Sequence, residues 1–186
     1  SKCEIFLIRI HANVVLKSFF RVYPQNLQAT LQSALNSLNS TFSMISDFNF
    51  SENHGNALLI ANMMSISDPT FVSNDLVLKI TVFATSFLKK QNASVGTLSY
   101  YKDLLCWIML TGLMNYKDKS FIQLQKNQLF LFWKNLLTHS ITFNTEDELY
   151  KNLEIRNHAL TCLLAFLKNH KALLDTELIK QVTYLL

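Results

Sequence analysis

The side chains best suited to chemistry lie near the C-terminal end of this 186-residue sequence. His158 and Cys162 are four residues apart, so a helix would place them on one face, where both could bind a zinc ion. A zinc site needs two further ligands, and His170 lies about 18 Å from His158 along a helix axis. The spacing therefore favours a buried cysteine beside a surface histidine, and we expect no bound metal.

Cys106 is the second candidate, as a nucleophile paired with a distant histidine. It lies in the most apolar segment of the sequence, where a charged thiolate would be costly. Three glycines provide no phosphate-binding loop, and the sequence contains neither a Glu-x-x-His pair nor a calcium loop. We therefore expect no enzyme activity, no catalytic residue and no cofactor. A helical enzyme or a metal-binding module is the alternative from another class.

The cysteines also indicate the redox environment. Cys3, Cys106 and Cys162 are odd in number and far apart, which is typical of buried free thiols in a reducing compartment such as the cytosol. No apolar run reaches the length of a membrane span, because the longest uncharged stretch, residues 22–46, is rich in Gln, Asn and Ser.

The net charge of +4 raises the question of a nucleic-acid partner. Only three arginines are present to clamp phosphates or read bases. The lysines are scattered, as expected for solvated helix faces. We expect no nucleic-acid binding, and instead a weak attraction to an acidic partner or to an anionic membrane surface. The scattered lysines are Lys79, Lys89, Lys90, Lys117, Lys119, Lys126 and Lys134.

Aromatic side chains recur at helical spacing, so they either form the core or line a peptide groove, and we favour the core. If a groove exists, we expect it along the second helices of successive helix pairs, the row that a solenoid commonly presents on its concave side. No residue is assigned to partner binding. The aromatic set is Phe19, Phe20, Phe83, Phe87, Trp107, Phe130, Phe132 and Trp133. The candidate groove residues are Gln28, Gln32, Asn36, Lys79, Lys126 and Lys134.

Helices must position all of these side chains. The composition is 49% hydrophobic and 16% charged, with three glycines and two prolines, so residues typical of β-turns are scarce and the chain is predicted to be all-α. Thr145 and Asp175 are expected to cap the last two helices. In the fifth helix, Gly112 would let a neighbouring helix approach closely.

Two apolar stripes are predicted to face the core. Both follow the three-and-four spacing of one helical face. The first helix carries Ile5, Ile8, Ala12, Val15 and Phe19. The seventh helix carries Leu149, Leu153, Leu160, Leu163, Leu164 and Leu167.

The predicted helices form pairs, with a short turn inside each pair and a longer connector between pairs. The turns inside three of the four pairs contain an aspartate, namely Asp68, Asp118 and Asp175. An aspartate in this turn is common in HEAT repeats. We predict a right-handed α-solenoid of about four HEAT-like antiparallel pairs, a single segment (1–186) of a longer solenoid. A single globular helical bundle is the alternative. The pairs are residues 2–45, 54–90, 98–138 and 146–186.

Several segments, taken in order, resemble a known family. Residues 154–181, EIRNHALTCLLAFLKNHKALLDTELIKQ, carry Glu154 and Arg156 ahead of Ala159 and Leu160. NHGNALLIANMM at 53–64, DLLCWIMLTGLM at 103–114 and LFLFWKNLL at 129–137 are similar to the family's preceding helices. Residues 52–186 thus resemble the HEAT-repeat-containing protein 5 family, whose yeast member is the large clathrin-adaptor accessory protein and whose plant member is called SWEETIE.

The resemblance implies a long solenoid without enzyme activity. Such a protein would bind the clathrin adaptor complex and its accessory proteins and help localise the complex for cargo retrieval. It would be cytoplasmic, and peripheral at the trans-Golgi network, endosomes and clathrin-coated vesicles, with the remaining repeats of the same chain as its other contacts. The alternative within this fold is another HEAT scaffold, such as a transport receptor or a kinase-associated protein.

Overall fold

The computed structural model describes residues 5–44, 48–89, 96–138, 143 and 145–185. Within these ranges the chain forms eight α-helices and two short 3-10 turns, without a β-strand, so the predicted all-α class is confirmed. None of the described helices is long and apolar enough to cross a membrane. The helices are α1 (Phe6–Val22), α2 (Leu27–Ser43), α3 (Phe50–Met64), α4 (Asn74–Leu88), α5 (Thr97–Leu113), α6 (Lys119–Thr138), α7 (Glu146–Asn169) and α8 (Thr176–Leu185), with 3-10 turns at Pro24–Asn26 and Lys171–Leu173.

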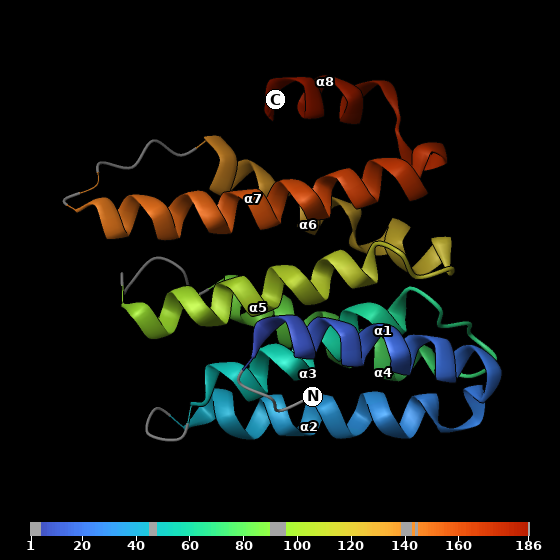
Figure 1. The fold of residues 1–186 in the computed structure, drawn as a ribbon. Helices are drawn as coiled ribbons and strands as arrows, with labels where there is room; N and C mark the ends of the chain where they lie inside the picture. Colours follow the sequence, from blue (N-terminus) through green and yellow to red (C-terminus); the bar gives the residue numbers. More distant parts are fainter. Residues whose placement is uncertain (1–4, 45–47, 90–95, 139–142, 144, 186) are drawn as a thin grey trace.

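The helices are arranged in two rows (Figure 1). In the first row α1 packs on α3, α3 on α5 and α5 on α7, while in the second row α2 contacts α4 and α6 contacts α8. The rows are joined where α2 packs on α3, α4 on α5 and α6 on α7. This alternation of helices between two rows is compatible with an α-solenoid. The handedness, the HEAT assignment and the boundaries of the four pairs stay predictions.

The predicted helix starts are present at α7 and α8. The Thr145 hydroxyl accepts a hydrogen bond from the Glu148 amide at 3.2 Å, and the Asp175 carboxylate accepts one from the Leu178 amide at 2.8 Å. Each cap satisfies an amide that has no partner inside its own helix. The two predicted caps are therefore confirmed.

Two of the turn aspartates also form ion pairs with neighbouring elements. Asp68 forms an ion pair with Lys117 at 3.6 Å, and Asp175 forms one with Lys126 at 3.1 Å. Asp118 accepts a hydrogen bond from the Ser120 amide in its own turn at 2.9 Å. Hydrogen bonds from backbone amides are the main reason that the pKa values of Asp68 and Asp175 lie below the ordinary carboxyl value.

At Gly112 the helix α5 lies very close to α3. A Cβ atom at this position would lie 2.2 Å from Cα of Ala61 and 2.6 Å from its carbonyl oxygen. The backbone of α3 therefore occupies the space that a side chain on α5 would need. The predicted close approach of a neighbouring helix is confirmed, and the neighbour is α3.

The predicted core stripe of α7 is wrong at most positions. Leu153 and Leu164 are 53% and 49% exposed, and Leu149 and Leu160 are also exposed, whereas Leu163 is buried and Leu167 half-buried. The buried face is shifted around the helix, and its small residues allow α5 to approach closely. The residues buried on α7 are Ile155, Ala159, Cys162, Leu163 and Phe166.

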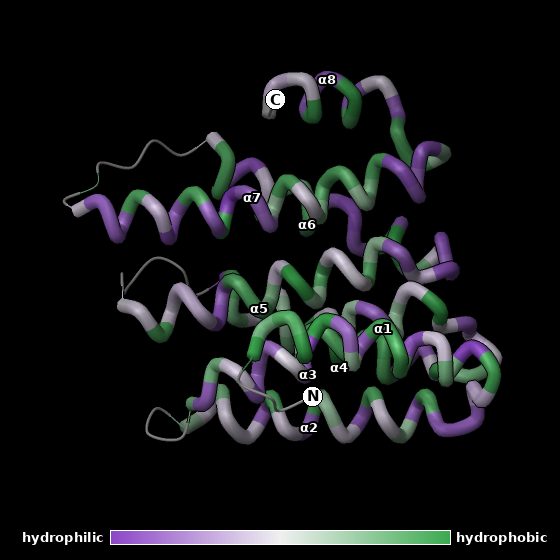
Figure 2. Tube along the Cα trace, viewed as in Figure 1, coloured by the Kyte–Doolittle hydropathy of each residue, from purple (hydrophilic) through white to green (hydrophobic). Residues whose placement is uncertain are grey.

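The predicted core stripe of α1 is also wrong. Val15 is 68% exposed, and Ile5, Ile8 and Phe19 are exposed as well, although hydrophobic residues are frequent along this helix (Figure 2). The described residues that α1 buries are Arg9, Asn13 and Phe20.

A polar contact with α3 explains why α1 buries charge. Arg9 Nε donates a hydrogen bond to Nδ1 of His54 at 3.2 Å, so the imidazole must be neutral at that nitrogen. Burial, followed by the positive charge of Arg9 and the field of His158, lowers the pKa of His54 to about 4. Asn13 Nδ2 donates to the Arg9 carbonyl at 2.8 Å. The Arg9 guanidinium therefore bonds across the helix contact to α3, whereas the Asn13 amide bonds within α1.

Candidate interaction surface

The suggested zinc ligands do not form a site among the described residues. No group of three His, Cys, Asp or Glu side chains in this part of the chain is arranged to hold a metal ion. Cys162 is fully buried, and burial raises the pKa of its thiol, while burial lowers the pKa of His158. Nε2 of His170 lies 2.9 Å from the carbonyl oxygen of Met114, so its proton joins the end of α7 to the end of α5.

Neither of the two cysteine thiols in the described part of the chain reaches the surface. Cys106 is completely buried on α5, and burial raises the pKa of its thiol well above the ordinary value. Cys3 lies outside the described residues. Burial of Cys106 and Cys162 argues against nucleophilic chemistry at either thiol. The surface grooves lie between helices of the second row.

A groove of about 580 Å³ runs between α2 and α4. Side-chain amides of α2 form one wall, and apolar side chains with Lys79 form the wall on α4. Lys79 is engaged within its own helix by Asp75 at 2.6 Å. The lining residues are Gln32, Leu35, Asn36, Asn39, Leu78, Lys79, Val82, Phe83, Ser86 and Phe87.

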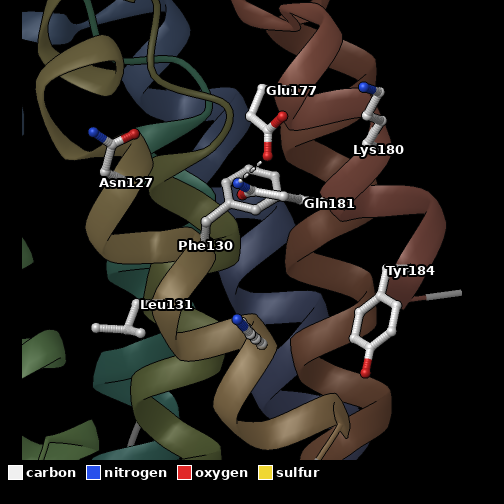
Figure 3. A pocket seen from close by; sticks show the side chains of 8 residues that line it. Asn127, Phe130, Leu131, Glu177, Lys180, Gln181 and Tyr184 are labelled. Carbon is white, nitrogen blue, oxygen red and sulfur yellow. Dashed lines mark hydrogen bonds between the residues drawn. The ribbon is translucent and has the colours of Figure 1, made fainter.

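A larger groove of about 700 Å³ lies between α6 and α8 (Figure 3). The buried ring of Phe130 lies between the two helices. Nε2 of Gln181 donates a hydrogen bond to the Glu177 carboxylate at 3.3 Å along α8. The lining residues are Asn127, Phe130, Leu131, Lys134, Glu177, Lys180, Gln181 and Tyr184.

Both grooves lie between second-row helices, where the sequence analysis placed them. Gln32, Asn36 and Lys79 line the first groove, and Lys134 lines the second. The other two candidates join helices instead of lining a groove. The Gln28 side-chain oxygen accepts from the Ser73 amide at 3.0 Å, and Lys126 pairs with Asp175. Lys90 lies outside the described residues.

The α8 wall of the larger groove was not predicted from the sequence. Lys180 and Tyr184 are four residues apart and exposed, on the opposite side of α8 from the buried Leu178 and Val182. That spacing signals a shared helix face. It does not reveal that α6 lies beside α8, because the contact between these two helices is tertiary.

The aromatic set is mainly core, as predicted. Phe20, Phe83, Trp107, Phe130, Phe132 and Trp133 are buried. Phe87 is half-buried and Phe19 is exposed. Phe83, Phe87 and Phe130 also contribute to the groove linings, so the same rings serve the core and the surface.

Comparison with known proteins identifies the relatives of this chain. It is 51% identical, over 184 residues and 99% of its length, to the AP-1 accessory protein LAA1 of Saccharomyces cerevisiae (strain ATCC 204508 / S288c). The chain belongs to the family of this yeast large clathrin-adaptor accessory protein. The resemblance deduced from residues 52–186 is thus confirmed, and the identity also includes the residues before them. The chain spans 9% of the length of the yeast relative. No family model and no solved structure matches the chain.

Proposed function

We propose that this chain is a segment of a non-enzymatic accessory protein that binds the clathrin adaptor complex. In this role it helps to localise the complex in vesicle traffic between the trans-Golgi network and endosomes, including cargo retrieval. Its place would be cytoplasmic and peripheral, at those membranes and on clathrin-coated vesicles. The observation that carries the proposal is the 51% identity, over 99% of this chain, to a protein named for its accessory role with AP-1.

The structure supports a scaffold role. Two rows of helices with grooves along one row offer surface for protein contacts. The two described thiols are buried, with pKa values raised by burial, and this chemistry suits a core better than an active site.

A segment exchange tests the proposal. The part of LAA1 that matches this chain would be replaced by the chain itself, and the tagged protein would be isolated from yeast cytosol. We expect adaptor subunits to be recovered with the chimera as they are with unaltered LAA1. Recovery with unaltered LAA1 but loss with the chimera would refute the proposal for this segment. Enrichment of nucleoporins or kinase subunits instead would favour a transport receptor or a kinase scaffold.

A deletion serves as the matched control. LAA1 without the corresponding segment should recover less adaptor than the chimera if this segment contributes to binding. Equal recovery from the deletion would show that other parts of the relative bind the adaptor and that this segment is dispensable.

A further inference from the structure

The α6–α8 groove carries two lysines that the fold does not use. Lys134 on α6 and Lys180 on α8 both line the groove and are exposed. Neither ammonium group has a hydrogen-bond or ion-pair partner within the described part of the chain. Lys126 differs, because it is held by Asp175 at 3.1 Å and so fixes the start of α8 relative to α6. Lys126 therefore helps to hold the two helices that form the groove. Lys134 and Lys180 contribute unpaired positive charges to its lining.

The remaining lining adds apolar surface between these charges. The Phe130 ring forms a buried floor, and Tyr184 is 75% exposed at the edge of α8. The single carboxylate of the lining, Glu177, already accepts a hydrogen bond from Gln181. Exposed aromatic surface next to unpaired cations is the chemistry that recognises an acidic peptide carrying a bulky apolar side chain.

We propose that the groove between α6 and α8 binds a short acidic segment of another protein, with a large apolar side chain over Phe130 and carboxylates near Lys134 and Lys180. The lining residues extend from Asn127 to Lys134 and from Glu177 to Tyr184, which is about 10 Å along each helix. This length accommodates about three extended residues. The inference deepens the proposed function, because it gives the scaffold a ligand class.

A membrane surface suits this site less well. Two lysines give only a weak attraction to an anionic bilayer, and lipid-binding segments usually carry clusters of about four to eight basic residues. The site is a concave groove of about 700 Å³ with an aromatic floor, whereas a bilayer offers a broad flat surface. The observations therefore favour a peptide.

Fluorescence anisotropy with synthetic peptides tests the inference on this chain. The probe is a short labelled peptide that alternates Asp or Glu with Phe or Leu, and the reference peptide has Asn and Gln in place of the acids. We expect the acidic peptide to bind more tightly, and its affinity to fall as salt is raised. The double variant Lys134→Glu/Lys180→Glu should weaken binding about tenfold or more, because two attractions become repulsions. Tyr184→Ala should weaken binding of both peptides.

The control variant Lys168→Glu/Lys171→Glu changes the net charge equally at exposed positions that are not in the groove lining. It should leave peptide affinity within about twofold of the unaltered chain. Circular dichroism should show the same helix content for all variants, since every substituted lysine is exposed. Equal weakening by both double variants would overturn the proposal, as would equal affinity for the acidic and amide peptides or no peptide binding.

The same variants distinguish an acidic peptide from an anionic membrane as the ligand of the groove. Vesicles of phosphatidylcholine with phosphatidylserine should bind no more strongly to the unaltered chain than to Lys134→Glu/Lys180→Glu. Vesicle binding that depends on these two lysines, without peptide binding, would replace the proposal by a membrane contact. Peptide binding with failure of the LAA1 chimera would refute the adaptor assignment and leave the groove assignment intact.

Discussion

Replacement of Gly112 by alanine should destabilise the fold, although alanine is the better helix former. The added Cβ would lie 2.2 Å from Cα, 2.6 Å from the carbonyl oxygen and 2.8 Å from the carbonyl carbon of Ala61. Because carbon atoms pack at about 3.5–4.0 Å, α3 and α5 would have to separate by about 1.5 Å at this point. All three atoms belong to the backbone of α3, so no side-chain rotation relieves the overlap.

The magnitude follows from two opposing terms. Overpacking of a core costs about 1–3 kcal/mol, and a backbone clash belongs at the upper end of that range. The glycine-to-alanine change in a helix returns about 1 kcal/mol. We therefore expect a net loss of about 2 kcal/mol in the free energy of unfolding. For a chain of this size the melting temperature should fall by about 4–8 °C.

Urea denaturation followed by circular dichroism measures the change. Gly96→Ala is the matched control, because Gly96 precedes α5, has a negative φ of −91° and has no atom within 4 Å of a built Cβ. It should change the stability by about 0.5 kcal/mol at most. The second substitution Ala61→Gly should not rescue Gly112→Ala, since the clash is with backbone atoms. A Gly112→Ala variant as stable as the unaltered chain would refute the close contact of α3 and α5.

Three further substitutions test the packing, the titration and the capping described above. Leu163→Ala should cost about 2–4 kcal/mol in urea denaturation, whereas Leu153→Ala should cost about 0.5 kcal/mol; the reverse order would restore the leucine stripe as the buried face of α7. The pKa of His54 is about 4 in the fold and about 6.5 in the unfolded chain, so the unfolded state binds more protons between these values. The stability that the neutral His54 side chain contributes should be complete above about pH 6.5 and fall toward pH 4. His54→Gln should therefore flatten the pH dependence of the urea midpoint. An unchanged pH dependence in this variant would contradict a neutral, buried imidazole. Thr145→Ala should lower stability by about 1 kcal/mol through loss of the α7 cap, whereas the exposed mid-helix change Thr161→Ala should be neutral or slightly stabilising; equal effects would argue against capping by Thr145.

The local features of the fold were predictable from the sequence because their causes are local. Thr145 and Asp175 stand directly before the amides that they cap, and a scarcity of glycine and proline leaves helices as the available structure. Gly112 inside an apolar helix indicated a close neighbour, although its identity as α3 came only from the structure.

The predicted buried faces of α7 and α1 were wrong for a different reason. Apolar periodicity identifies the largest apolar stripe of a helix, whereas packing selects the face that fits its neighbours. On α7 that face includes the small residues Ala159 and Cys162, against α5. On α1 it includes Arg9, which donates a hydrogen bond to His54 on α3, and a buried polar group needs such a partner.

The sequence by itself determined an all-α chain, its helix caps, its turn aspartates and the row of helices in which grooves would lie. The tertiary structure alone decided which helix faces are buried, and it brought Lys134 and Lys180 to the rim of one groove. Hydrogen bonds within a turn depend on residues a few positions apart, and a short stretch of sequence contains all of them. A groove depends on two helices that are joined by tertiary contacts, and no periodicity within either helix records that contact.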